Sequence, residues 1–229
     1  MPDRLQLRKV VFYGRSLEEY RLFFNLDDRH LAGRRILDCP AGTASFCAEA
    51  SHLGARVVGL DPGYALAPEA MADTARADIA HTLAEVRRIQ HVYRWGHFRS
   101  LAEMEQARYR ILERFLCDLK SAPPGRYLAG KLPSLPFADG AFDLVLSGHL
   151  LFIYEEYLDF EFHCAAIREM LRVGGELRLF PVAGMDRQPW RPLGRLQAAL
   201  ASEGITLQLE PSREEFAAGW NTLAIARRG

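Results

Sequence analysis

The sequence carries no excess of charge of either sign, since 29 Lys and Arg residues balance 29 Asp and Glu residues in a chain of 229. Without a net positive field the chain has little to hold a phosphate backbone, so we expect no nucleic-acid partner. It also lacks an uninterrupted apolar run of the about 20 residues that span a membrane. Residues 1–16 are too charged for a signal peptide. We therefore expect a soluble cytoplasmic protein with no membrane partner.

Cysteine and histidine are sparse and show no metal-ligand spacing. The four cysteines form no C-x-x-C pair and fall inside apolar segments, which favours reduced, buried thiols over disulfides or zinc: Cys39, Cys47, Cys117 and Cys164. Asp159 and His163 stand four residues apart on an expected helix and could share a metal ion. No third ligand is evident, so we prefer a helix-stabilising pair and expect no metal site.

Hydrophobic residues make up 49% of the chain, enough to bury one substantial core, and we expect a single domain over residues 1–229. Short apolar segments alternate with helical patterns, which predicts a doubly wound, mostly parallel α/β sheet. We expect seven strands, the last two of which form an antiparallel pair: residues 34–39, 55–61, 126–130, 142–147, 174–182, 206–210 and 221–227.

Two helical regions stand outside this alternation. We expect residues 1–30 to form an N-terminal helical cap, in which Ser16 and Glu19 make a capping-box pattern. Residues 65–120 carry apolar residues at helical spacing, which predicts two or three amphipathic helices inserted after the second strand. We expect this insertion to act as a lid.

Acids, glycines and a histidine follow three of the expected strands. Asp38 ends the first strand shortly before Gly42, Asp61 ends the second, and His149 follows the strand at residues 142–147. In open α/β sheets, ligands bind at the carboxyl ends of the strands. A glycine lets backbone approach a ligand, and an acid about 20 residues later can accept hydrogen bonds from ribose hydroxyls. These positions therefore indicate a nucleotide-like cofactor site.

Each of these features also has a purely structural interpretation. Asp38 and Gly42 could cap the helix that follows them, and Asp61 could belong to an ordinary turn. We favour cofactor contact, because acids stand at two adjacent strand ends. His149 could equally be a satisfied core residue, and for it both interpretations stay open.

Four segments in succession carry a resemblance to a known family: ILDCPAGTASF (36–46), VVGLDP (57–62), LPFADGAFDLVLS (135–147) and REMLRVGGELRLF (168–180). In order and spacing they resemble the successive motifs of class I S-adenosylmethionine-dependent methyltransferases. The resemblance covers residues 34–182 apart from the helical insertion. It implies a Rossmann-like class I methyltransferase fold and S-adenosyl-L-methionine as the cofactor.

The resemblance implies roles for the first loop. Asp38 and Gly42 match the acid and the second glycine of the family's D-x-G-x-G-x-G motif. Pro40 stands in place of the first glycine and Ala44 in place of the third. Proline keeps the turn tight by restricting φ, and alanine needs little space. We expect residues 38 and 40–42 to contact the cofactor, including Ala41.

The resemblance also implies contacts to adenosine. Asp61 matches the ribose-binding acid, and Pro62 would lie against the adenine. The family often has an acid before a Leu-Pro-Phe segment that pairs with the adenine amino group. Here Lys131 takes that place, which removes one specific contact, and Gly130 and Leu132 could supply only backbone groups.

The remaining cofactor candidates follow the fourth expected strand or lie near the N-terminus. The resemblance puts His149, two residues after Ser147, near the methionine part of the cofactor. The family often folds an N-terminal helix over the cofactor, which makes Tyr13 and Tyr20 candidates as well. A general base is useful where the acceptor is a hydroxyl, thiol or protonated amine. Our candidates for that base all lie on the segment that leaves this strand: His149, then Tyr154 and His163.

The acceptor is the least determined part of this interpretation. Enzymes that methylate base amino groups carry N/D-P-P-Y/F after the fourth strand, and cytosine C5 enzymes carry Pro-Cys there. This chain has SGHL at 147–150 instead, so we expect a small-molecule acceptor. A non-catalytic binding or scaffold protein with the same fold is the alternative. An NAD site ranks last, since G-x-G-x-x-G spacing is missing. Monomer and homodimer stay open.

Overall fold

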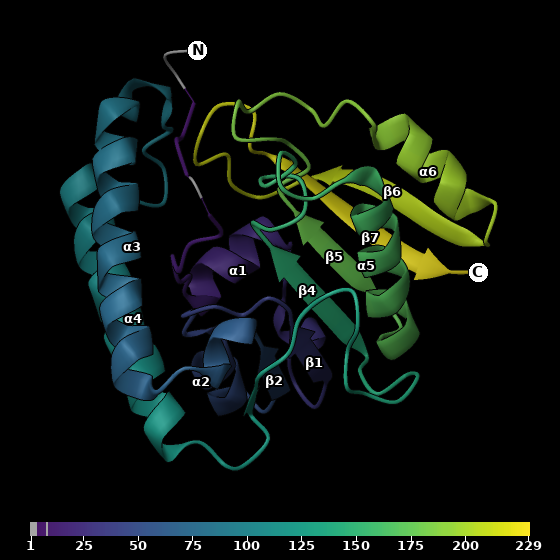
Figure 1. Ribbon diagram of the computed structural model, residues 1–229, viewed down its shortest axis with the longest axis horizontal. Helices are drawn as coiled ribbons and strands as arrows, with labels where there is room; N and C mark the ends of the chain where they lie inside the picture. Colours follow the sequence, from purple (N-terminus) through teal and green to yellow (C-terminus); the bar gives the residue numbers. More distant parts are fainter. Residues whose placement is uncertain (1–3, 8) are drawn as a thin grey trace.

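The computed structural model describes residues 4–7 and 9–229, so part of the predicted N-terminal cap lies outside the described residues (Figure 1). Seven strands form one sheet in the order β3-β2-β1-β4-β5-β7-β6. Neighbouring strands from β3 to β5 are parallel, whereas β7 is antiparallel to both β5 and β6. The predicted sheet with its antiparallel C-terminal pair is confirmed. Its strands are β1 (Arg35–Asp38), β2 (Arg56–Leu60), β3 (Tyr127–Leu128), β4 (Leu144–Gly148), β5 (Leu177–Phe180), β6 (Ile205–Pro211) and β7 (Thr222–Arg228).

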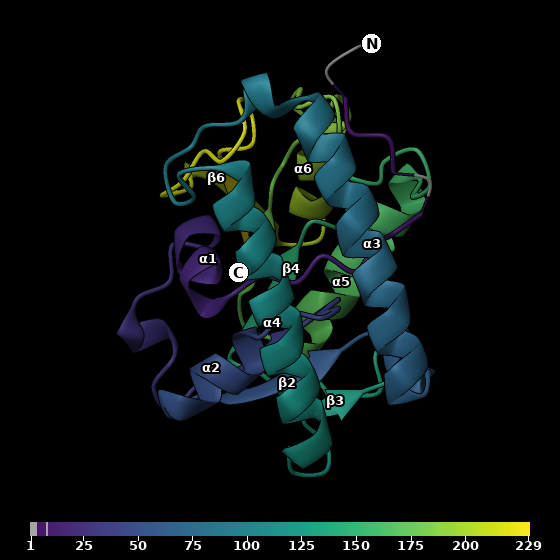
Figure 2. The same cartoon turned by 90° about the vertical axis from the view of Figure 1, so that its left-hand side faces the viewer.

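Helices cover both faces of the sheet. One face carries α5 and α6, and the other carries α1 and α2, beyond which α3 and α4 lie side by side (Figures 1 and 2). The α-helices are α1 (Leu17–Phe23), α2 (Phe46–His52), α3 (Pro68–Arg88), α4 (Leu101–Ser121), α5 (Phe160–Val173) and α6 (Leu193–Ala201). Three short 3₁₀ helices are η1 (Asp28–His30), η2 (Pro62–Ala65) and η3 (Gln90–Val92).

The central strands are mostly apolar because both of their faces are covered. In β1, Ile36 packs in the core beneath α1 and α2, while Leu37 packs in the core beneath α5 and α6. In β4, Leu146 packs in the first of these cores and Val145 in the second. Neighbouring residues point to opposite faces of a strand, so a continuous apolar run supplies two cores at once.

Two local predictions can be compared with the structure. Ser16 caps α1, and Glu19 closes the capping box as expected. The sequence pattern predicts the next helix over residues 43–53, but α2 begins three residues later, at Phe46. The reason is tertiary: Gly42 takes a φ of 52°, and the Ser45 N–H donates to the Arg15 carbonyl at 3.1 Å instead of joining a helix.

All four cysteines are free thiols, and three of them are buried as predicted. The prediction is wrong for Cys117, which is exposed on α4. An amphipathic helix has a solvent-facing side, and the local sequence did not show that Cys117 lies on it. In the part of the chain that the structure describes, no helix has the length and apolar composition needed to cross a membrane.

Candidate active site

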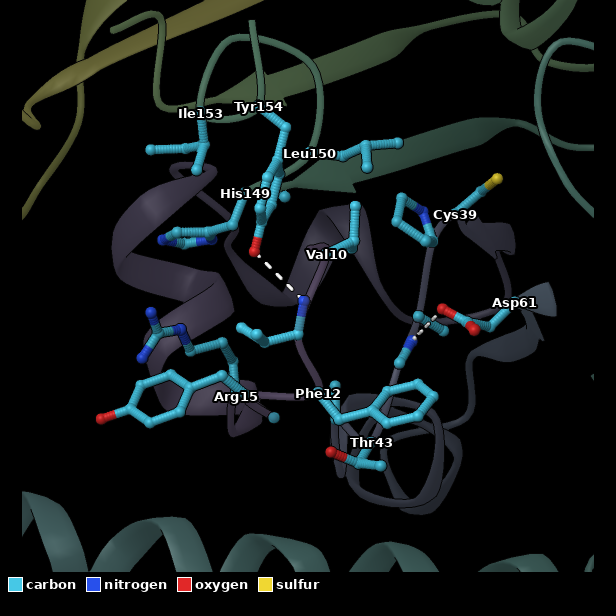
Figure 3. A pocket seen from close by; sticks show the side chains of 18 of the residues that line it. Val10, Phe12, Arg15, Cys39, Thr43, Asp61, His149, Leu150, Ile153 and Tyr154 are labelled. Carbon is cyan, nitrogen blue, oxygen red and sulfur yellow. Dashed lines mark hydrogen bonds between the residues drawn. The ribbon is translucent and has the colours of Figure 1, made fainter. Parts of the chain in front are cut away.

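A cavity of about 340 Å³ lies at the carboxyl ends of β1, β2 and β4. It is lined by the loops after these strands, by residues 10–15 of the N-terminal segment and by residues of α1. Figure 3 shows Asp61 at one end and Arg15 with His149 at the other. We call these the Asp61 end and the Arg15 end. The volume is within the range of small-molecule sites, about 300–1,000 Å³.

The Asp61 end is built from backbone groups around one buried carboxylate. The Gly42 N–H donates to Asp61 Oδ2 at 3.0 Å, and the Gly63 N–H donates to Oδ1 at 2.7 Å. The first of these bonds joins the loop after β1 to the loop after β2, and the second lies within the loop after β2. Burial raises the pKa of Asp61, and the two backbone hydrogen bonds oppose that rise. Each carboxylate oxygen has a second lone pair, so Asp61 can still accept a hydrogen bond from a ligand hydroxyl.

The aromatic ring of Phe12 packs against this end of the cavity. A Cβ atom added to Gly63 would lie only 2.3 Å from Phe12 Cζ, and one added to Gly42 would lie 3.7 Å from Cδ1. The Phe12 N–H donates to Asp78 Oδ2 of α3 at 3.0 Å, which holds the N-terminal segment against the inserted helices. The sequence analysis did not single out Phe12, because a lone aromatic residue in an expected cap carries no motif.

The other residues predicted on the adenosine side also line the cavity. Lys131 lines the cavity, as do five neighbours of the strand-end loops: Pro40, Ala41, Gly42, Pro62 and Leu132. Backbone contact ties the Lys131 loop to β2, since the Gly130 N–H donates to the Asp61 carbonyl at 3.4 Å. The Lys131 side chain itself is exposed.

Asp38 does not line the cavity. It is fully buried, and both of its carboxylate oxygens lie 2.9 Å from the Tyr20 hydroxyl, which donates to them. Burial raises the pKa of Asp38 well above its usual range, and the hydrogen bond from Tyr20 opposes this. Tyr20 stacks on Phe46 at 4.3 Å and does line the cavity. Asp38 thus fixes a ring that forms the wall.

At the Arg15 end, His149 stands at the carboxyl end of β4 with a φ of 56°. Its imidazole packs among aromatic rings, with centroids 5.3 Å from Phe23 and 5.7 Å from Phe216. Burial lowers the pKa of His149 well below its usual value, and the positive charges of Arg15 and Arg108 lower it further. The ring is therefore neutral at pH 7. Among the described residues, its Nε2 has no hydrogen-bond partner.

Two other candidate bases lie in different surroundings. Tyr154 lines the cavity, and its hydroxyl oxygen accepts a hydrogen bond from the Val11 N–H at 3.2 Å (Figure 3). Burial raises the pKa of Tyr154 to about 12, so the hydroxyl stays protonated. His163 does not line the cavity: its ring nitrogens lie 2.7 and 3.0 Å from the carbonyls of Asp159 and Leu151. The His163 ring also stacks on Trp190, with the two ring centroids 4.4 Å apart.

Two further residues were predicted to contact the cofactor, and only one of them lines the cavity. Tyr13 lines the cavity, close to Arg15, whose guanidinium carbon is 4.7 Å from the centre of the Tyr13 ring. Ser147 does not line it, and its hydroxyl is buried with no partner in the described residues. Successive residues of a strand point to opposite faces, so a regular strand would place Ser147 and His149 on the same side. The left-handed backbone at His149 breaks this alternation.

The strand order, the antiparallel β7 and a cavity at the carboxyl ends of β1, β2 and β4 together define a Rossmann-like class I methyltransferase fold. The predicted resemblance in fold is thereby confirmed. The two helices between β2 and β3 are an addition to the repeating strand–helix units.

The chain belongs to the same family as the uncharacterized protein MJ0045 of Methanocaldococcus jannaschii. The two are 30% identical over 225 residues, which cover 98% of this chain and 99% of the relative. No protein-family model matches the sequence.

Solved structures of methyltransferases are similar to this chain at low identity. Magnesium protoporphyrin IX methyltransferase from Synechocystis, with bound S-adenosylmethionine, is 16% identical with a TM-score of 0.46, covering 88% of this chain and 73% of that one. A putative S-adenosylmethionine-dependent methyltransferase from Methanococcus maripaludis is 11% identical with a TM-score of 0.49, covering 93% and 83%. Since identities and TM-scores are low, the fold assignment rests on the strand order.

Proposed function

We propose that this protein is an S-adenosylmethionine-dependent methyltransferase that acts on a small-molecule acceptor. One observation carries the proposal: the buried Asp61 carboxylate just after β2 accepts a hydrogen bond from the Gly42 N–H of the β1 loop, at the edge of the cavity. This joins an acid suited to ribose hydroxyls to a loop whose backbone can approach a ligand closely.

The cavity has polar groups that suit a polar ligand. Buried polar atoms without a hydrogen-bond partner in the described residues include five from side chains that line it: Tyr13 Oη, Arg15 Nε, Thr43 Oγ1, Thr82 Oγ1 and His149 Nε2. An unsatisfied buried polar group costs about 1–3 kcal/mol, so a ligand that reaches these groups after small side-chain rotations would recover part of that free energy.

Separate parts of the cavity would hold separate parts of the cofactor. Asp61 would bind the ribose, while Pro62 and the backbone of residues 130–132 would enclose the adenine. When bound, S-adenosylmethionine supplies an electrophilic methyl group on a sulfonium. The chain's own residues would position the acceptor and exclude water, which the aromatic side chains that line the cavity favour. His149 Nε2 is the atom we propose as the proton acceptor, since the imidazole is neutral and the residue lines the cavity, so that a small rotation of the ring would bring the buried Nε2 to the acceptor. Tyr154 stays a candidate whose hydroxyl would first have to lose its proton.

A small acceptor is supported by the size of the cavity, about 340 Å³, and by its walls. Residues 10–15 of the N-terminal segment form one wall and are tied to α3 through Asp78. The chain also has no net positive charge to attract the phosphate backbone of nucleic acid. A non-catalytic binding protein is the second candidate, and the packing of Phe12 against Gly63 at the Asp61 end favours it.

Calorimetric titration with S-adenosylmethionine and S-adenosylhomocysteine tests the proposal. We expect binding by the wild type and a loss of about tenfold or more in Asp61→Asn, because a hydrogen bond to a charged group contributes about 1.5–3 kcal/mol. Asp139→Asn is the matched control, since this carboxylate is 83% exposed and pairs with Arg172 on the surface.

Three outcomes decide between the candidates. Binding that is lost in Asp61→Asn, followed by methylation of small molecules and not of RNA or DNA, supports the proposal. Binding without turnover on any acceptor favours the non-catalytic candidate. A folded wild type that binds neither ligand refutes the proposed cofactor.

A further inference from the structure

We propose that the Arg15 end of the cavity binds a carboxylate group of a ligand, with the Arg15 guanidinium as its ion-pair partner. The inference rests on the proposed function, because it names a second recognition element of the same cavity. The carboxylate comes either from the amino-acid part of the cofactor or from the methyl acceptor. Both sources present the same chemistry to Arg15, and experiment can separate them.

The inference begins with a buried cluster of two arginines and one glutamate. Arg108 Nη1 donates to Glu19 Oε2 at 2.8 Å and Nη2 donates to Oε1 at 2.5 Å, which makes a bidentate pair. The two side chains are only 1% and 2% exposed. Arg15 Nη1 stands 3.5 Å from the same Glu19 Oε1, beyond normal hydrogen-bond distance. Two positive charges therefore share one negative charge.

The surroundings of Arg15 do not supply the missing negative charge. In the described part of the chain, Glu19 is the only carboxylate within ion-pair distance of Arg15. The other neighbours are aromatic: the guanidinium carbon lies 4.7 Å from the ring centre of Tyr13, 5.6 Å from Phe216 and 5.8 Å from Phe23. Cation–π contacts are favourable but leave the charge in place. Burying an uncompensated charge is costly, so a ligand anion is its natural partner.

The site is reachable from the cavity and matches an anion of one charge. Arg15 lines the cavity and its side chain keeps 13% exposure, while its Nε has no partner among the described residues. His149 is neutral and adds no second positive charge. An excess of one charge balances a carboxylate and not a dianionic phosphate. The planar guanidinium also fits a planar carboxylate, and the rings favour an apolar group beside it.

Calorimetry on full-length wild type, Arg15→Gln and a control variant tests the inference. Arg21→Gln is the control, since Arg21 belongs to α1, pairs with Asp28 and does not line the cavity. The first pair of probes is S-adenosylhomocysteine and 5′-methylthioadenosine, which lacks the amino-acid part. The second pair is 3-phenylpropanoate and its uncharged amide, each titrated with and without S-adenosylhomocysteine.

Arg15→Gln should weaken a carboxylate-bearing probe about tenfold or more and leave its uncharged counterpart unchanged. Loss confined to S-adenosylhomocysteine identifies the cofactor's carboxylate, and loss confined to 3-phenylpropanoate identifies the acceptor's. If neither probe depends on Arg15, the inference is overturned, while normal S-adenosylhomocysteine binding keeps the proposed function. If the wild type binds only 3-phenylpropanoate in an Arg15-dependent manner, the inference stands and the cofactor assignment falls.

Thermal unfolding without ligand separates ligand binding from a structural role. Arg15→Gln removes the uncompensated charge and leaves the Arg108–Glu19 pair intact. We therefore expect an unchanged or higher melting temperature in this variant. A clear fall in melting temperature, with no selective loss for either carboxylate, would mean that Arg15 serves the fold and would contradict the inference.

Discussion

The two ends of the cavity are built in different ways. At the Asp61 end, a single carboxylate is held by two backbone N–H groups from the loops after β1 and β2. At the Arg15 end, charged and aromatic side chains from distant segments meet, and one positive charge is left uncompensated. The first end is a product of the sheet and its loops. The second depends on the N-terminal segment, on α4 and on the loop before β7.

This difference separates what the fold provides from what this chain adds. Loops at the carboxyl ends of parallel strands form a ligand site in any protein with this topology. Apart from His149 after β4, the Arg15 end uses residues outside the parallel strands and their loops, so it can vary while the sheet stays the same. We therefore expect recognition specific to this family to reside at the Arg15 end. Four predictions test the contrast, in order of decreasing effect.

Breaking the buried ion pair of the Arg15 end should have the largest effect. Glu19→Gln leaves Arg108 and Arg15 buried without a carboxylate, and loss of one partner of a buried pair costs about 3–5 kcal/mol. Urea denaturation measures the free energy of unfolding. Glu18→Gln on the same helix is the control, since that side chain is 74% exposed. A loss below about 1 kcal/mol would show that the cluster is not a buried charge site.

At the Asp61 end, Gly63→Ala should cause steric strain. The new Cβ would lie 2.3 Å from Phe12 Cζ, and overpacking of this kind costs about 1–3 kcal/mol in unfolding free energy. Combining it with Phe12→Leu should recover part of the loss, because the two residues are in contact. Gly194→Ala in α6 is the control, where nothing lies within 4 Å of the added atom. Additive losses in the double variant would contradict this packing.

His149 should make stability depend on pH below neutrality. Its pKa in the folded protein lies below the value of about 6.5 in the unfolded chain. Between these values the unfolded chain binds a proton that the folded protein does not. Stability therefore falls as pH falls below about 6.5, by at most about 1.4 kcal/mol per pH unit.

The contribution of His149 is measured as the difference between the pH profiles of stability of the wild type and its variants. Burial also lowers the pKa of His30 and His163, so the wild type alone is not informative. His149→Asn, which tolerates the positive φ, should show a flatter pH profile in denaturation between pH 5 and 7. The exposed His52→Asn should keep the wild-type slope. Parallel profiles for all three proteins would show that His149 is not buried as a neutral ring.

The smallest effect should come from Lys131→Glu. An acid at this position would restore the contact to the adenine amino group that the family often has, worth about 0.5–1 kcal/mol at an exposed site. We expect S-adenosylmethionine to bind about two- to fivefold more tightly in calorimetry. Lys120→Glu, at the end of α4, makes the same charge change away from the cavity. Equal or weaker binding in Lys131→Glu would place the adenine elsewhere.

Much of the fold could be predicted from local patterns. Apolar segments alternating with helical ones led to all seven strands, although β3 has only two residues and α2 begins later than expected. The capping box of Ser16 and Glu19 was visible because both partners lie within four residues. Asp61, Gly42 and His149 were found because strand ends are local features, and all three line one cavity.

The rest of the site depends on contacts between distant residues. Asp38 faces Tyr20 and not the cavity, and these residues are 18 positions apart. Arg108 meets Glu19 across 89 positions, from the middle of an inserted helix whose pattern showed only amphipathicity. Phe12 and Arg15 carry no motif at all. Each became a candidate only when the N-terminal segment was seen to run along the cavity.

The sequence by itself determined where the strands lie along the chain, where the helical insertion lies, and the acid and glycine at two strand ends. Periodicity and turn chemistry act over a few residues, so they can be recognised in a single chain. Only the tertiary structure decided which carboxylate faces the cavity, which rings close it and where one positive charge lacks a partner. Those outcomes depend on packing and desolvation, which arise when segments far apart in the sequence bury one another's charges.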